Sequence, residues 1–135
     1  ATDVPRLVEP LLLGRYDVSL GSRFLPGALA AGMPLVRRMI LKLAVRFDQI
    51  RTGLAITDTH NSLRAFSSRA AQLMDLRHDG MAHASEILDH IARHHLRYLE
   101  APVTVRYTPY SMAKGQGMGS GFAILRDLLV RRWLP

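Results

Sequence analysis

The sequence contains no cysteine, which excludes both a disulfide framework and a thiolate metal site. No apolar stretch approaches the roughly 20 residues that a membrane-spanning helix requires, and no secretory leader opens the chain. Aromatic residues make up only 7% of the chain and form no pattern with the basic ones, so nucleic acid is an unlikely ligand. We therefore expect a soluble or peripherally membrane-attached protein of a reducing compartment.

Acidic residues are also scarce. Eleven Asp and Glu face eighteen Lys and Arg, which gives a formal net charge of +7. All but two of these cations, Lys42 and Lys114, are arginine. The planar guanidinium matches the geometry of phosphate and carboxylate oxygens. An anionic partner is expected, such as a nucleotide, a phospholipid surface or a nucleic acid.

The 135 residues are enough for one domain, and we expect a single unit over 1–135. Apolar spacing and turn residues predict an α/β fold, in which helices alternate with strands. The expected helices cover about 2–13, 34–52, 67–76, 81–96 and 122–133, and strand material covers 16–22, 63–66 and 97–110. Pro10 should kink the first helix or end it early. No βαβ unit opens the chain, so we expect the later part of a larger fold.

Polar residues crowd the stretch "AITDTHNSLRAFSS" between two apolar runs, around Asp58, Asn61, Ser62 and Arg64. Asp, Asn and Ser bond their own backbone and hold turns, so a turn into a strand explains the pattern without any chemistry. The alternative is the rim of a binding site. Composition alone leaves both open.

Acidic and imidazole side chains recur along the expected helix 81–96. Glu86, His90 and His94 are spaced i, i+4, i+8, and His83 falls in the same arc. Such a face can bind a divalent metal, but a solvated helix face has the same pattern. The H-E-x-x-H motif is absent, so these histidines are only weak metal candidates.

Three further segments allow two interpretations each. The glycine-rich "KGQGMGSG" is either a phosphate cradle or a mobile loop. The basic amphipathic helices 34–52 and 122–133 either pack their apolar faces in the core or lie on an anionic membrane. In the first of these helices the apolar positions are Leu35, Met39, Ile40, Leu43 and Phe47.

Six stretches, taken in order, resemble the latter half of bacterial family-two glycosyltransferases. This group includes polyprenol-phosphate sugar transferases such as dolichol-phosphate mannose synthase. The stretches span nearly the whole chain: "GSRFLPG", "PLVRR", "TDTHNSLRAF", "MAHASEIL", "EAPVTVRYTPYSMAKGQ" and "ILRDLL".

The resemblance implies a GT-A fold, whose N-terminal α/β half binds a nucleotide-sugar and whose D-x-D motif holds a divalent metal. This chain contains no D-x-D. It would then be the C-terminal, acceptor-side portion of a GT-A-like domain, without the nucleotide-binding βαβ unit. The Mg²⁺ or Mn²⁺ would be held mainly by the other half, and the 135 residues alone would be inactive.

The resemblance also implies roles for individual residues. Arg23 and Arg37 match arginines that meet phosphates of donor or acceptor, and Lys114 matches a basic residue of a loop that closes over the substrates. Asp58 and Arg64 match the ends of the family's D-P-T-x-G-F-R-A segment beside the active site. The chain departs from the family pattern at three positions: Leu41, Thr59 and Ser62.

The implied activity is transfer of a sugar from a nucleotide-sugar to a polyprenyl phosphate or to a saccharide, at the cytoplasmic side of the inner membrane. A phosphate acceptor is already an oxyanion and needs no general base. A saccharide hydroxyl needs a carboxylate to accept its proton, and Asp58 or Glu86, an acidic position of the following helix, would supply it. The rival hypothesis is a basic, non-enzymatic module that binds anionic membrane or nucleic acid.

Overall fold

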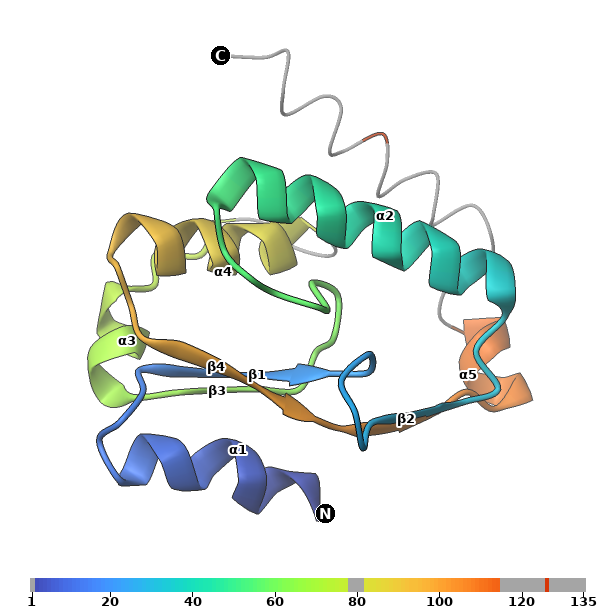
Figure 1. Ribbon diagram of the computed structural model, residues 1–135, viewed down its shortest axis with the longest axis horizontal. Coiled ribbons are helices and arrows are strands. Elements are labelled where there is room, and N and C mark those ends of the chain that lie inside the picture. Colours follow the sequence, from blue (N-terminus) through green and yellow to red (C-terminus); the bar gives the residue numbers. More distant parts are fainter. Residues whose placement is uncertain (1, 78–81, 115–125, 127–135) are drawn as a thin grey trace.

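The structure is a computed structural model that describes residues 2–77, 82–114 and 126. It is a mixed α/β arrangement, as the sequence predicts (Figure 1). The helices are α1 (Asp3–Leu12), α2 (Leu35–Thr52), α3 (Ser68–Leu73), α4 (Ala82–Arg93) and α5 (Pro109–Lys114). The strands are β1 (Val18–Ser22), β2 (Leu29–Ala31), β3 (Arg64–Phe66), β4 (Tyr98–Pro102) and β5 (Thr104–Arg106).

Local signals set most of the helix ends. Gly53 ends α2 in the left-handed conformation, with φ of 73°, and its N–H donates to the carbonyl of Gln49. Ser67 caps α3 by accepting a hydrogen bond from the N–H of Ala70. Pro10, in contrast, does not end α1, which continues to Leu12. Leu7, which is only 2% exposed, packs this helix against Ala101 and Val103.

The strands form two small sheets. In the first, β1 lies between β3, to which it is antiparallel, and β4, to which it is parallel. The second sheet is the parallel pair of β2 and β5. The chain passes from β4 to β5 at Val103, whose N–H donates to Ser22 and whose carbonyl accepts from Leu29. The strand material predicted over 97–110 is therefore divided between the two sheets.

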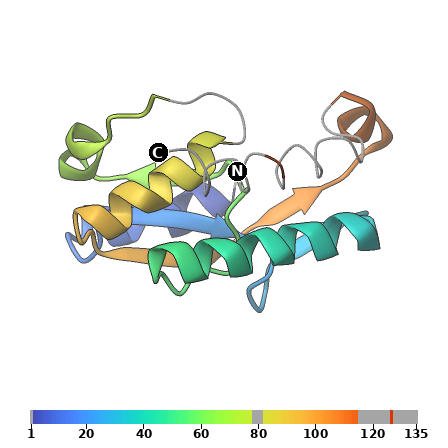
Figure 2. The ribbon, with the colours of Figure 1, turned by 90° about the horizontal axis from the view of Figure 1, so that it is seen from above.

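Helices cover both faces of the three-stranded sheet. Figure 1 shows α2 and α4 on one side and α1 on the other, and Figure 2 shows α2 and α4 lying over the strands. The main core lies mostly between the strands and α4. It consists of Val18, Leu20, Ile56, Ala70, Ile87, Leu88, Ile91 and Leu96. A smaller cluster, formed by Leu7, Ala101 and Val103, packs under α1.

The helix α2 has apolar residues on two opposite sides. Its inner side is buried and contains Leu41, Ala44, Val45 and Asp48. A second set, which we call the α2 stripe, is exposed: Leu35, Val36, Met39, Leu43 and Ile50. At 100° per residue the two sets point in opposite directions. Core packing of this stripe, one of the two alternatives from the sequence, is therefore wrong for Leu35, Met39 and Leu43.

Some sequence predictions concern residues outside the described ranges. The final helix over 122–133, except Arg126, and the glycine-rich residues 115–121 are among them. The strand material expected to reach residue 110 and the loop expected to follow it are corrected in part, because Pro109–Lys114 form α5. Within the described ranges, no helix combines the length and the apolar character needed to cross a bilayer.

Candidate functional site

The end of β1 brings two distant dipeptides together. Gly21 allows the approach, because a Cβ there would lie 2.8 Å from the carbonyl oxygen of Leu63 and 2.9 Å from Cγ1 of Val103. Ser22 and Arg23 follow directly. They face Thr57–Asp58, the start of the polar stretch that the sequence singles out.

Arg23 and Asp58 form a buried, bidentate ion pair. Nε of Arg23 donates to Oδ2 of Asp58 at 2.7 Å, and Nη2 donates to Oδ1 at 2.8 Å. The backbone N–H of Arg23 adds a third bond to Oδ2, at 3.0 Å. The side chains are 7% and 0% exposed. Burial by itself lowers the pKa of the Arg23 guanidinium, but Asp58 outweighs it, so that pKa lies above its ordinary value.

Tyr107 connects this pair to Arg37. Nη1 of Arg23 donates to the Tyr107 hydroxyl at 2.5 Å. The guanidinium of Arg37 stands over the Tyr107 ring, with 5.1 Å from its Cζ to the ring centroid. The two arginines that the resemblance assigns to phosphate binding therefore meet at one aromatic residue, which just follows β5.

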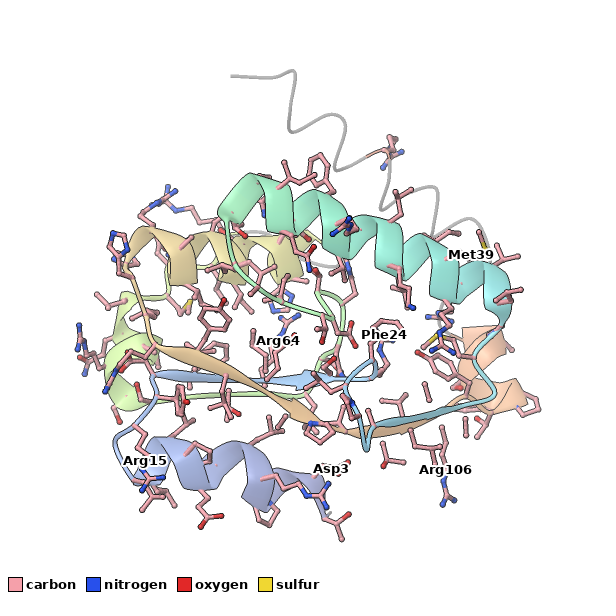
Figure 3. The ribbon with its side chains drawn as sticks, viewed as in Figure 1. Asp3, Arg15, Phe24, Met39, Arg64 and Arg106 are labelled. Carbon is pink, nitrogen blue, oxygen red and sulfur yellow. The ribbon has the colours of Figure 1, made fainter. Side chains whose placement is uncertain are left out.

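Positive charge also gathers around Phe24, which Figure 3 shows near the end of β1. Arg23, Arg38 and Lys42 lie 5.8, 5.9 and 5.8 Å from the centroid of its ring. We call Arg23, Arg37, Arg38 and Lys42 the basic cluster. Such a concentration of cations at the end of a strand suits an anionic ligand, and phosphate in particular.

Glu100 on β4 holds the opposing dipeptide, and sequence reasoning missed it. Its Oε1 accepts from the backbone N–H of Thr57 at 2.7 Å and from that of Asp58 at 3.3 Å. Its Oε2 accepts from the Thr57 hydroxyl at 2.9 Å, and this hydroxyl lies 2.6 Å from the Ser22 hydroxyl. Burial is the main cause that raises the pKa of Glu100. The only sequence signal that could have revealed Glu100 is the presence of a carboxylate within a predicted strand.

The rest of the polar stretch forms a turn, as one alternative predicts. Asn61 Oδ1 accepts from the N–H of Leu63, and Nη2 of Arg64 donates to the carbonyl of Thr59 at 2.7 Å. Arg64 extends from β3 toward the side of the sheet that carries α2 and α4 (Figure 3). Burial lowers the pKa of Arg64 and also that of His60.

Glu86 and the histidines of α4 form a separate group. Glu86 Oε1 accepts from the backbone N–H of Arg77, whereas Nε2 of His90 lies 3.1 Å from the carbonyl oxygen of Asp75. The rings of His90 and His94 stack at 5.7 Å. In 2–77, 82–114 and 126, no three His, Asp or Glu residues gather as metal ligands, and His83 adds none. Lys114 is the last residue of α5.

Comparison with known proteins connects this chain to glycosyltransferases. No family model matches the chain. An uncharacterised protein of Methanocaldococcus jannaschii is 35% identical over 133 residues, which is 96% of this chain and 54% of that protein. A UDP-N-acetylglucosamine–dolichyl-phosphate N-acetylglucosaminyltransferase of Methanococcus voltae is 30% identical over 95% of the chain and 52% of its own length. An undecaprenyl-phosphate mannosyltransferase of Micrococcus luteus is 29% identical, with 96% and 53% covered.

The chain spans about half the length of these relatives. Nearly all of its own residues take part in each of these matches. The chain is thus a distant, partial-length homologue of glycosyltransferases, among them enzymes named for dolichyl phosphate and undecaprenyl phosphate.

Proposed function

We propose that this chain is the acceptor-side portion of a GT-A glycosyltransferase that moves a sugar from a nucleotide-sugar to a polyprenyl phosphate. The observation that carries the proposal is the basic cluster at the end of β1, in a chain similar to transferases named for lipid phosphates. Arg37 and its neighbours would neutralise the acceptor phosphate and align its oxygen for attack on the sugar.

The geometry of Asp58 favours phosphate over a saccharide hydroxyl as the acceptor. Both of its oxygens accept from Arg23, and its side chain is fully buried. A carboxylate held in this way turns both oxygens to Arg23 and presents neither to a substrate hydroxyl. A phosphate oxyanion needs no such base. We therefore assign Asp58 the role of holding Arg23, and Glu86, on α4, lies in a separate hydrogen-bonded group.

Within the described residues, no group of three or more His, Asp or Glu side chains could hold the Mg²⁺ or Mn²⁺ expected of this enzyme class. The proposal assigns the metal, with the nucleotide-sugar, to a nucleotide-binding half that carries D-x-D. No step proposed for this chain passes through the metal.

The α2 stripe provides the contact with the membrane that a lipid acceptor requires. Its apolar residues face away from the sheet, and Figure 3 shows Met39 among them. Arg38, Lys42 and Arg46 flank the stripe on the same helix and are exposed. An apolar band beside basic residues is typical of helices that lie on anionic lipid. Peripheral contact at the cytoplasmic face would bring the basic cluster to the depth of the acceptor phosphate.

A transfer assay tests the function. The full-length gene product that contains this sequence is incubated with a panel of labelled nucleotide-sugars, Mg²⁺ or Mn²⁺, and either undecaprenyl phosphate or an oligosaccharide. We expect transfer to the lipid. Arg37→Lys, which keeps the charge but loses the planar fork, should lower kcat/KM by roughly a hundred- to a thousandfold. Arg15→Lys, near α1 on the far side of the sheet (Figure 3), is the control and should stay near wild type.

Two outcomes of that assay would contradict the proposal. Transfer to the oligosaccharide alone would contradict the acceptor. No transfer with any donor, together with firm binding to anionic vesicles or nucleic acid, would favour the rival, a basic non-enzymatic module.

Vesicle flotation tests the membrane contact separately. Leu43→Glu puts a charge into the α2 stripe and should reduce recovery with anionic vesicles. Leu12→Glu is the matched control, because Leu12 is also an exposed leucine but lies on α1, on the opposite side of the sheet. Equal recovery for both variants would refute the role of the stripe. Removal of 122–135, predicted from the sequence to contribute as well, is measured in parallel.

A further inference from the structure

Glu100 and Asp58 are two carboxylates that serve the same short segment. Glu100 accepts both consecutive backbone N–H groups, of Thr57 and of Asp58, and also the Thr57 hydroxyl. Placing a partly buried carboxylate beside a second one is costly, since each disfavours the charge of the other. Three hydrogen bonds to this one side chain offset that cost and hold the segment in place.

The hydrogen bonds align two dipeptides residue by residue. The Ser22 hydroxyl meets the Thr57 hydroxyl, and the Arg23 guanidinium meets the Asp58 carboxylate. Glu100 lies behind the second dipeptide and fixes its backbone from β4, the strand parallel to β1. Without it, the Asp58 side chain would keep its partner but lose the anchor that determines its orientation.

Arg23 connects this anchored segment to the basic cluster. This guanidinium also donates to the Tyr107 hydroxyl, and Arg37 stacks on that ring. We propose that Glu100 is a positioning residue, which acts on the acceptor phosphate only through Asp58 and Arg23. This inference rests on the proposed function for its last step, the phosphate, but not for the alignment itself.

The experiment separates these two parts. In the full-length gene product labelled with ¹⁵N-arginine, the Nε–H of Arg23 is assigned from its loss in Arg23→Lys, and its exchange with solvent is measured. Affinity for farnesyl phosphate, a soluble polyprenyl phosphate, is measured by calorimetry, with farnesol as the uncharged control. The variants are Glu100→Ala, Glu100→Gln and Thr57→Val, and Glu9→Gln on the exposed side of α1 is the matched control.

We expect Glu100→Ala to speed exchange of the Arg23 Nε–H about ten- to a hundredfold, because three hydrogen bonds to a charged group are lost. Farnesyl phosphate affinity should fall by about tenfold or more, while amide protection in the core strand β1 stays unchanged. Glu100→Gln keeps the Oε1 acceptor and should lie between, as a partial rescue. If Glu100→Ala does not fold, Arg23 exchange and farnesyl phosphate affinity are compared with wild type in Glu100→Gln and Thr57→Val instead.

Each result decides something. Unchanged Arg23 exchange in Glu100→Ala, or in both milder variants, overturns the positioning role whatever happens to binding. If Glu100→Ala speeds Arg23 exchange but leaves farnesyl phosphate affinity unaltered, Glu100 does not act on the acceptor phosphate. A wild-type protein that does not bind farnesyl phosphate contradicts the proposed function instead, and Arg23 exchange then still tests the alignment.

Discussion

An Asp–Arg pair stands at each end of β1, and the two differ chiefly in the exposure of the arginine. Before the strand, Asp17 meets Arg97 at 3.3 Å; the Asp17 side chain is 6% exposed, whereas that of Arg97 is 56% exposed. After the strand, Arg23 meets Asp58 at 2.7 Å, with both side chains buried. The first pair joins the start of β1 to the start of β4. The second pair joins the end of β1 to the loop after α2.

The difference shows what burial does to the same chemistry. An exposed pair is screened by water and salt and contributes little to stability. A buried pair pays a large desolvation cost, and removing one partner leaves an uncompensated charge. At the start of β1 the Arg97 guanidinium is exposed, so water and salt weaken its attraction to the buried Asp17 carboxylate. The end that holds Arg23 is a rigid position, suitable for a binding site.

The largest effect should come from breaking the buried pair. Asp58→Ala leaves Arg23 buried without its partner, and we expect a loss of about 3–5 kcal/mol in the free energy of unfolding. Urea denaturation monitored by circular dichroism measures it. A loss below about 1 kcal/mol would show that the Arg23 guanidinium escapes to solvent.

Replacing both partners sharpens the comparison. Arg23→Met combined with Asp58→Leu removes both charges and should recover most of that stability, as apolar replacements of buried pairs often do. Recovery stays incomplete because the Tyr107 hydroxyl loses its donor. Under the proposed function, the double variant should have lost glycosyl transfer. If the double variant is as active as wild type, the pair serves the fold alone.

A smaller effect concerns His60, in the same polar stretch as Asp58. Burial lowers its pKa below the ordinary 6.5, so the unfolded chain binds a proton more readily. His60 should therefore cost stability as the pH falls below about 6.5. Thermal melts at pH 7.5 and 5.5 should show a larger drop for wild type than for His60→Asn. An equal drop in both proteins would assign the acid sensitivity to other groups.

The smallest effect belongs to the pair at the start of β1, in which the arginine is exposed. Hydrogen bonds from Arg97 lower the pKa of Asp17 below its ordinary 3.8, so the pair stabilises the fold above that pH and stops doing so as Asp17 protonates. Asp17→Asn should cost far less than Asp58→Ala at pH 7, and the cost should shrink in 1 M salt. A salt-independent loss as large as that of Asp58→Ala would contradict the contrast.

Sequence patterns predicted the elements well where a local cause decides them. Gly53 ends α2 at Thr52, in agreement with the predicted helix 34–52, and the predicted helix 81–96 forms α4, whose apolar side packs in the core. The orientation of α2 was not predictable, because apolar residues occupy two opposite sides and periodicity cannot choose which side meets the sheet. Tertiary packing makes that choice, and it leaves the α2 stripe outside.

The candidate site was predicted only in part. The resemblance brought Arg23, Arg37 and Asp58 to attention, although not that Arg23 and Asp58 pair with each other. Glu100 and Tyr107 were missed, because their partners lie 43 and 84 positions away along the chain. Such pairings arise from the way the strands assemble and have no local signature.

The tripeptide Gly21–Ser22–Arg23 has an evolutionary consequence. A different neighbour constrains each of its three residues. Gly21 contacts Leu63 and Val103, Ser22 meets the Thr57 hydroxyl, and Arg23 pairs with the buried Asp58 carboxylate. A mutation at one residue therefore cannot compensate for a mutation at another. Replacing this tripeptide alone by a dissimilar one from another gene should destabilise the fold. Replacing it together with Thr57–Asp58 should leave the fold stable, provided that Gly21 is kept. The tripeptide and Thr57–Asp58 should therefore change together in evolution, although they lie far apart in the sequence.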